Sequence, residues 1–139
     1  VIGAGLGIAS AMEKTGAAAS IANVVVSTVG PLGPIGALVA IYALCLLMAE
    51  MLHHAAAVAI VFPIAIAAAN QVGSDPRGFI IATAVAGACA FASPVTYQSH
   101  LIVYGPGGYR FTDFVRVGLP LDLIAAAVAM LVIPWVWPL

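Results

Sequence analysis

Residues 35–69 have the sequence IGALVAIYALCLLMAEMLHHAAAVAIVFPIAIAAA. Two apolar runs, residues 35–49 and 55–69, flank the more polar stretch 50–54. Each run has 15 residues, which reach only about 23 Å as a helix, whereas a straight membrane span needs about 20 residues. Two short apolar helices joined by a polar tip therefore predict a re-entrant hairpin, which enters the bilayer and returns to the side from which it came.

The composition places the chain in a membrane. Hydrophobic residues make up 64% of the 139 residues and charged residues only 6%, whereas a soluble domain carries about 25% charged residues. No Asp, Glu, Lys or Arg occurs in residues 15–49, 51–74 or 78–109. One or two such runs could be buried core helices, but three that cover most of the chain predict membrane spans. The predicted fold class is therefore all-α integral membrane.

A second interruption of the apolar pattern follows the hairpin. Residues 78–92 form another run of 15 residues, and it leads into residues 93–110, which are rich in proline, glycine and hydroxyl side chains. In lipid, such a break survives only where it is buried in protein or lines a wet cavity. Discontinuous helices near the bilayer midplane are typical of transporter binding sites. We therefore predict four parts: a scaffold-type transmembrane helix region (1–33), the re-entrant hairpin with its tip near 50–55 (34–70), a broken transmembrane helix with a loop at 93–108 (78–112) and a final transmembrane helix (113–139).

All three histidines of the chain lie at these two interruptions. His53 and His54 lie in the hairpin tip, and His100 lies in the loop of the broken helix. A re-entrant tip offers free helix-end amides to an anion and free oxygens to a small cation, and ionisable groups at membrane depth are functional candidates. The structural alternative for each histidine is a packing residue whose hydrogen bonds are satisfied. Because the histidines are confined to the two interruptions, we favour a functional site.

The sequence offers little support for other function classes. A zinc-protease helix needs the pattern His-Glu-x-x-His, whereas His53 and His54 are adjacent and would point about 100° apart on a helix. The net charge of −1 provides no basic surface for nucleic acid. Cys45 and Cys89 lie inside apolar runs, where cysteine acts as a small packing residue. We therefore expect neither an enzyme with catalytic residues nor a nucleic-acid-binding protein.

Several motifs carry a resemblance to a known family. Residues 5–16, GLGIASAMEKTG, are similar to a family stretch that ends in Lys, a polar residue, Thr or Ser, and Gly. Glu50 and Pro63 match the residues that bracket a hairpin tip, and residues 89–94, CAFASP, match the lead-in to a broken helix. Residues 103–111, VYGPGGYRF, form the longest similar run. The chain resembles the second inverted repeat of the divalent anion:sodium symporters, also called solute carrier family 13 of the ion transporter superfamily, and is nearest to their sulfate or anion permease branch.

The resemblance implies a fold and a site. It implies one inverted repeat of an ion-transporter-type fold, in which each repeat clamps a sodium ion between its hairpin tip and the loop of its broken helix. The anion then lies between the tips of the two repeats. Carried over by position, the family's Ser/Thr-Asn-Thr/Asn tip motif falls on His53, His54 and Ala55, and its loop Asn falls on His100. The implied substrate-binding residues are His53, His54, Ala55, Ser93 and Pro94, and the implied coupling-ion residues are His53, His54, Ser93, Thr96 and His100.

These signature positions depart from the family pattern. Asn and Ser offer neutral oxygens, which suit sodium, whereas His offers nitrogen, which suits sodium poorly. Histidine titrates near neutral pH, so we hypothesise that His53, His54 or His100 carries a proton in place of sodium. Two alternatives stay open: the site is degenerate and coupling depends on the other repeat, or backbone carbonyls still hold sodium.

The expected function is secondary active transport of a small inorganic or carboxylate anion, either sulfate or a di/tricarboxylate, coupled to sodium or protons by alternating access. The alternatives are a passive anion channel and a non-transporting membrane subunit. The chain begins at Val1 without an initiator Met, and we expect it to be a piece of a longer transporter. Its expected partners are the lipid bilayer, an N-terminal repeat of the same protein and a second copy in a homodimer. We expect a multi-pass protein of the plasma membrane that needs no cofactor or metal other than sodium.

Overall fold

The computed structural model describes residues 2–29 and 33–138, and within these ranges the chain forms helices and no strand. The helices are α1 (Ile2–Thr15), α2 (Ala17–Val29), α3 (Gly33–Met51), α4 (His54–Val72), α5 (Pro76–Ala88), α6 (Gln98–Tyr104) and α7 (Phe111–Val136). Of these, α3, α4 and α7 are long and apolar enough to cross a membrane. The all-helical class predicted from the sequence is therefore confirmed, and the helices fit a multi-pass membrane protein.

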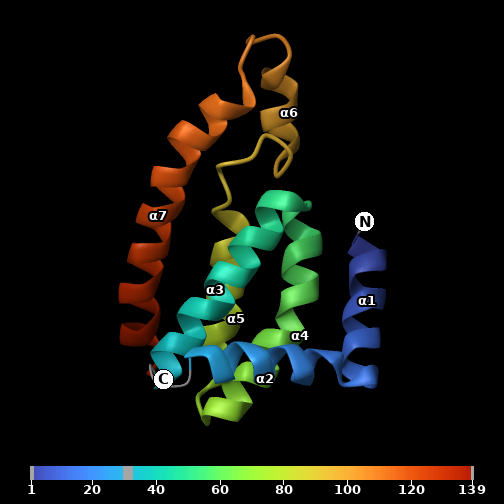
Figure 1. Cartoon of the computed structure of the whole chain (residues 1–139), viewed down its shortest axis with the longest axis vertical. Helices are drawn as coiled ribbons and strands as arrows, with labels where there is room; N and C mark the ends of the chain where they lie inside the picture. The colour runs from blue at the N-terminus through green and yellow to red at the C-terminus, as the bar shows by residue number, and fades with distance from the viewer. Residues whose placement is uncertain (1, 30–32, 139) are drawn as a thin grey trace.

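The antiparallel hairpin of α3 and α4 packs against α5 in the centre of the molecule (Figure 1). Its core is made of branched and aromatic side chains with alanines between them, and the largest are at most 2% exposed: Leu38, Ile41, Val61, Ile64 and Phe79. Small residues let helix backbones approach closely. At Gly87 of α5, a Cβ atom would overlap the side chain of Val58 on α4. The close packing of α5 on α4 fixes where α5 ends relative to the hairpin.

The two hairpin helices are longer than the sequence pattern suggested. Each has 19 residues, or about 28 Å at 1.5 Å per residue, because α3 continues through Glu50 and α4 continues through Asn70. Helix length therefore no longer argues for a re-entrant hairpin. The hairpin turn lies partway along α7, whereas α5 and α6 together follow α7 over most of its length (Figure 1). The re-entrant character of the hairpin stays a prediction.

The connection between α4 and α5 has conventional helix-capping chemistry. Gly73 ends α4 in the left-handed conformation (φ 70°), which glycine adopts without steric cost. The N–H of Ser74 donates to the carbonyl of Ala69 at 3.0 Å, as expected for a left-handed helix end. Asp75 then caps α5 by accepting a hydrogen bond from the Arg77 N–H at 2.9 Å. This turn holds α4 and α5 antiparallel.

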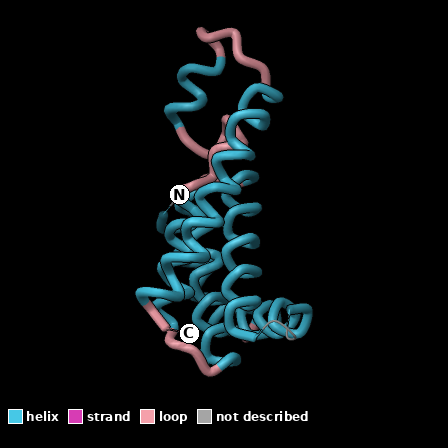
Figure 2. Tube along the Cα trace, turned by 90° about the vertical axis from the view of Figure 1, so that its left-hand side faces the viewer, coloured by secondary structure: helices cyan, strands magenta, loops and turns pink. Residues whose placement is uncertain are grey.

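The remaining helices surround the hairpin and α5. The two views show that α2 lies across the end of the molecule at which the hairpin opens, nearly perpendicular to the other long helices (Figures 1 and 2). α1 has 14 residues and α2 has 13, and both belong to the region predicted as scaffold-type. α7 runs along the outside and contacts α5 and α3. The scaffold role of residues 1–33 stays a prediction.

Candidate functional site

The hairpin turn is a tight connection in which a histidine caps a helix. α3 ends at Met51 and α4 begins at His54. His53 is the N-cap of α4, with an extended backbone (φ −68°, ψ 134°), and its Nδ1 accepts a hydrogen bond from the N–H of Ala55 at 3.4 Å. An Nδ1 that accepts this bond carries no hydrogen of its own. His53 thus supplies the acceptor that an N-cap side chain provides.

The broken helix is interrupted earlier than the sequence suggested. α5 ends at Ala88, although the apolar run predicted a helix as far as residue 92. Residues 89–97, which we call the interruption, form no regular structure before α6 begins. Ser93 is 5% exposed and Thr96 is 0% exposed. Ala90 and Pro94 are buried as well, whereas Val95 is 50% exposed. Much of the interruption is thus covered by protein, as a break in a membrane helix would need to be.

Two carboxylates bind the backbone of the interruption. The N–H of Phe91 donates to Asp122 Oδ1 at 2.9 Å, and the N–H of Ala92 donates to Glu50 Oε1 at 2.9 Å. In a continuous helix these amides would bond to carbonyls four residues earlier. Here side chains from α3 and α7 accept them instead, which explains how the chain leaves the helical path. Glu50, which the sequence placed at the hairpin tip, thus accepts the Ala92 amide.

Thr96 joins the interruption to the hairpin. Its hydroxyl donates to the carbonyl of Ala49 near the end of α3 at 3.3 Å, and its own carbonyl lies 3.3 Å from His54 Nδ1. Likewise, His100 Nδ1 lies 3.2 Å from the carbonyl of Ser93. Because a carbonyl only accepts, Nδ1 must carry the hydrogen in both histidines.

The three histidines lie in one row of rings. Ring centroids are 4.2 Å apart between His53 and His54, 4.9 Å between His54 and Tyr97, and 5.3 Å between Tyr97 and His100. The row reaches Phe114 of α7, 5.5 Å from His100, and Phe114 also lies near the rings of Tyr104 and Tyr109. The expectation that His53 and His54 diverge assumed that both lie on one helix, whereas His53 precedes α4. The hairpin turn, the interruption and α6 therefore bring all three histidines together.

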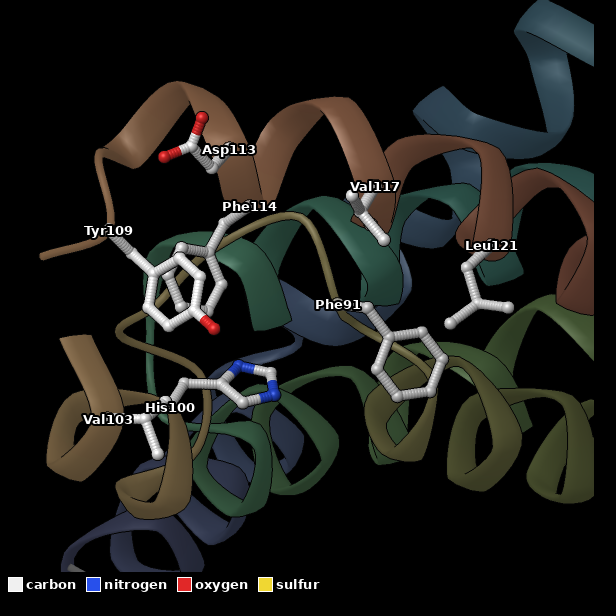
Figure 3. A pocket seen from close by; sticks show the side chains of 9 residues that line it. Phe91, His100, Val103, Tyr109, Asp113, Phe114, Val117 and Leu121 are labelled. Carbon is white, nitrogen blue, oxygen red and sulfur yellow. The ribbon is translucent and has the colours of Figure 1, made fainter. Parts of the chain in front are cut away.

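Two cavities adjoin this row. The tip cavity, of about 450 Å³, is lined by His53, His54, Tyr97, Gln98 and Ser99. A second cavity, of about 380 Å³, lies between the interruption, α6 and α7 (Figure 3). Its lining is mainly apolar and aromatic, with His100, Tyr109 and Asp113 as its titratable side chains. The polar tip cavity is the better candidate for a small anion.

The structure brings most of the predicted site residues to one junction. His53, His54, Ser93, Thr96 and His100 all take part in the contacts between the hairpin turn, the interruption and α6. Ala55 contributes its backbone N–H, and Pro94 is buried in the interruption. Their roles in binding stay predictions.

Sequence reasoning missed two members of the junction. Asp122 is the single charged residue in the apolar run 117–137, a placement that by itself marks a functional candidate. Tyr97 was not assigned a role, yet its ring lies between those of His54 and His100, and its hydroxyl donates to the carbonyl of Ala88. No local pattern predicts this ring contact.

A helical hairpin whose turn meets a buried break in another apolar helix is typical of membrane transporters. The chain matches the family model described as the sodium:sulfate symporter transmembrane region over residues 1–139. It belongs to this family, which confirms the resemblance inferred from the sequence motifs.

Three relatives show the range of similarity. A Chlamydomonas reinhardtii protein named as a proposed regulator of the sulfur deprivation response is 39% identical over 129 residues, which are 93% of this chain and 22% of that protein. An uncharacterised transporter of Synechocystis sp. is 35% identical over 117 residues, 84% of this chain and 19% of that protein. Sodium/sulfate cotransporter 1 of C. reinhardtii is 35% identical over 129 residues, 92% of this chain and 15% of that protein. The chain thus spans about a fifth or less of the length of these relatives, and no solved structure gives a significant match.

Proposed function

We propose that this chain is part of a secondary active transporter that carries sulfate, or a related small anion, across a membrane together with a cation. Family membership and relatives named sodium/sulfate cotransporters support this function. The observation that carries it is the junction at Thr96, which bonds to Ala49 of α3 and to His54 of α4. A purely structural bundle has no reason to break a helix and to satisfy the freed amides with two carboxylates.

The anion is proposed to bind in the tip cavity, at the start of α4. First-turn amides and the positive end of a helix dipole favour an anion. His53, His54 and Ala55 form the start of α4, where the Ala55 N–H already donates to His53 Nδ1. Ser93 and Pro94 of the interruption are proposed to complete the anion site, although they do not line the tip cavity. The Tyr97 hydroxyl and His54 Nδ1 already donate to the carbonyls of Ala88 and Thr96. The cavity lining offers the His53 imidazole, the Gln98 amide and the Ser99 hydroxyl as hydrogen-bond donors. Such donors suit sulfate, with a di/tricarboxylate as the competing substrate class.

The coupling site in this chain is proposed to hold a proton on His54 or His100. The carbonyls of Thr96 and Ser93, which could otherwise coordinate sodium, already bond to these two side chains. Each Nε2 atom is left to exchange a second proton. His53 is less suited because its Nδ1 accepts from the Ala55 N–H. Sodium, which the names of several relatives include, would then bind elsewhere in the whole transporter.

The whole transporter is proposed to contain an N-terminal repeat that supplies a second hairpin tip and a sodium site. The greater length of the relatives supports a larger protein. Alternating access would move the hairpin and the broken helix as one body, since Thr96, Glu50 and Asp122 tie them together. We place this transporter in the plasma membrane as a homodimer with a re-entrant α3–α4 hairpin.

Uptake of labelled sulfate by the full-length protein in proteoliposomes tests the function. An inward sodium gradient at fixed pH should accumulate sulfate above its equilibrium level, and an added inward proton gradient should raise this level further. His54→Asn and His100→Asn keep an amide that donates to the same carbonyls but cannot titrate. Each should therefore reduce the proton-dependent part of uptake and retain the sodium-dependent part.

Three outcomes would contradict parts of the proposal. Strict sodium dependence that a pH gradient does not change would exclude the proton role of the histidines. Uptake that only follows the sulfate concentration gradient would favour a passive channel over a symporter. Stronger competition by a dicarboxylate or tricarboxylate than by unlabelled sulfate would assign the second substrate class.

A further inference from the structure

A pair of carboxyl groups lies behind the tip junction, between α3, the interruption and α7. Glu50 Oε1 and Asp122 Oδ1 accept the N–H groups of two consecutive residues, Ala92 and Phe91, at 2.9 Å each. Because the two amides belong to consecutive residues, the two carboxyl groups lie close together. Asp122 is only 5% exposed, and Glu50 Oε2 is buried with no other partner among the described residues. The pair thus connects three elements through one backbone segment.

No cation balances this pair among the residues that the structure describes. The titratable groups that face it are Tyr42 of α3 and Cys89 of the interruption near Asp122, and Tyr97 near Glu50. Tyrosine and cysteine are neutral at physiological pH unless their environment favours the charged form, and a neighbouring carboxylate disfavours it. Two adjacent ionised carboxylates would therefore repel each other without compensation. One shared proton removes this repulsion and gives Glu50 Oε2 a hydrogen-bond partner.

The backbone of α7 also contacts residues 91 and 92 of the interruption directly. Gly118, one helical turn before Asp122, is buried, and a Cβ atom there would overlap the carbonyl of Phe91 and the Cα of Ala92. Only glycine allows this approach, so α7 contacts the interruption through its backbone as well as through Asp122. This contact is independent of the carboxyl pair and converges on the same two residues.

We propose that Glu50 and Asp122 are positioning residues for transport, which share one proton and hold the interruption against α3 and α7. They act through Phe91 and Ala92, whose placement brings Thr96 to the hairpin turn. Loss of the shared proton separates the two carboxylates by repulsion and releases the interruption. The effect on uptake rests on the proposed function, whereas the effect on stability does not.

The pH dependence of unfolding tests the shared proton directly. Free carboxyl groups have pKa values of about 4, so unfolding at neutral pH releases the proton that the folded pair holds. The stability from the pair is then complete below about pH 4 and decreases as the pH rises, with the unfolding equilibrium constant increasing about tenfold per pH unit until the folded pair loses its proton. Thermal unfolding of the purified full-length protein in detergent, from acid to alkaline pH, measures this decrease.

Amide variants separate the proton from the hydrogen bonds. Glu50→Gln and Asp122→Asn each keep an oxygen that accepts the backbone N–H and add an NH₂ group that donates to the remaining carboxylate. They should lose the pH-dependent decrease of the wild type and stay stable at alkaline pH. Glu50→Ala and Asp122→Ala leave a buried amide without an acceptor and should lower the unfolding temperature at every pH. Asp75→Asn, a cap on α5 that asparagine also supplies, should keep the wild-type pH dependence.

Sulfate uptake by the same variants in proteoliposomes tests the positioning role. To remove the proposed histidine-dependent part of the pH response, uptake is driven by sodium in a protein that also carries His54→Asn and His100→Asn. In this background Glu50→Gln and Asp122→Asn should retain uptake and lose its decline at alkaline pH, whereas the alanine variants should lower the initial rate about tenfold, as expected for an unsatisfied buried donor. Amide variants that unfold with the wild-type pH dependence, or that are as unstable as the alanine variants, would overturn the shared proton. The amide and alanine variants could differ in stability as predicted while the wild type takes up no sulfate. That result would contradict the proposed function but would still support a shared proton between Glu50 and Asp122. Uptake that keeps its alkaline decline in both amide variants would overturn the positioning role.

Discussion

His53 occupies a position where the family pattern has a small hydroxyl residue, yet it performs the local task that such a residue performs. Its Nδ1 accepts the Ala55 N–H at the start of α4, as a serine or asparagine side chain does at a helix N-cap. We predict that His53→Asn leaves stability near the wild type, whereas His53→Ala lowers it by about 1 kcal/mol. Denaturant unfolding of the full-length protein measures both. Equal destabilisation by the two substitutions would show that the cap contributes nothing.

Gly118 has a steric role at a contact between backbones. A Cβ atom there would overlap the Phe91 carbonyl, and backbone atoms move less easily than the end of a flexible side chain. Gly118→Ala should therefore cost about 1–3 kcal/mol, as overpacking typically does. Gly105→Ala provides the matched control, because no atom lies within 4 Å of a Cβ at that position. A Gly118→Ala protein as stable as the Gly105→Ala protein would contradict this close approach.

At the scale of elements, one buried hydroxyl contributes to the contact of the interruption with α3. Thr96→Val keeps the shape of the side chain but removes the bond to the Ala49 carbonyl. We expect a loss of about 1 kcal/mol in stability, together with reduced sulfate uptake. Thr83→Val is the matched control, since that buried hydroxyl bonds only to Phe79 within its own helix. Uptake that falls equally in both variants would point to general destabilisation and would contradict the junction role.

Local sequence patterns predict these elements well and their ends poorly. The charge-free runs predict α3, α4 and α5, the last apolar stretch predicts α7, and the polar stretch at residues 50–54 predicts the hairpin turn. The end of α5 could not be predicted from local sequence, because the Phe91 and Ala92 amides bond to Asp122 and Glu50, which lie 31 and 42 positions away in the sequence. For the same reason Glu50 was placed outside the first hairpin helix, although a polar residue can continue a helix when a distant partner binds its side chain.

At the scale of the whole molecule, the candidate site combines elements that no single motif describes. The two interruptions predict where the histidines gather, but the ring row depends on Tyr97 and Phe114, and the carboxyl pair depends on Asp122 of α7. Much of α7 remains exposed in this chain, including Leu131 and Trp135. This exposure suits an apolar surface that meets lipid or other parts of a larger protein.

The central claim is that an anion binds where α4 begins, beside the interruption. Protection of a single cysteine from a membrane-permeant thiol reagent tests it most directly. Ala55→Cys is introduced into full-length protein with Cys45 and Cys89 replaced by Ala, and Met51→Cys, at a residue that is 80% exposed, provides the control near the hairpin turn. We predict that sulfate slows modification of the cysteine at position 55 in a concentration-dependent way and leaves that at position 51 unchanged. Equal modification rates at position 55 with and without saturating sulfate would contradict an anion site at this hairpin tip.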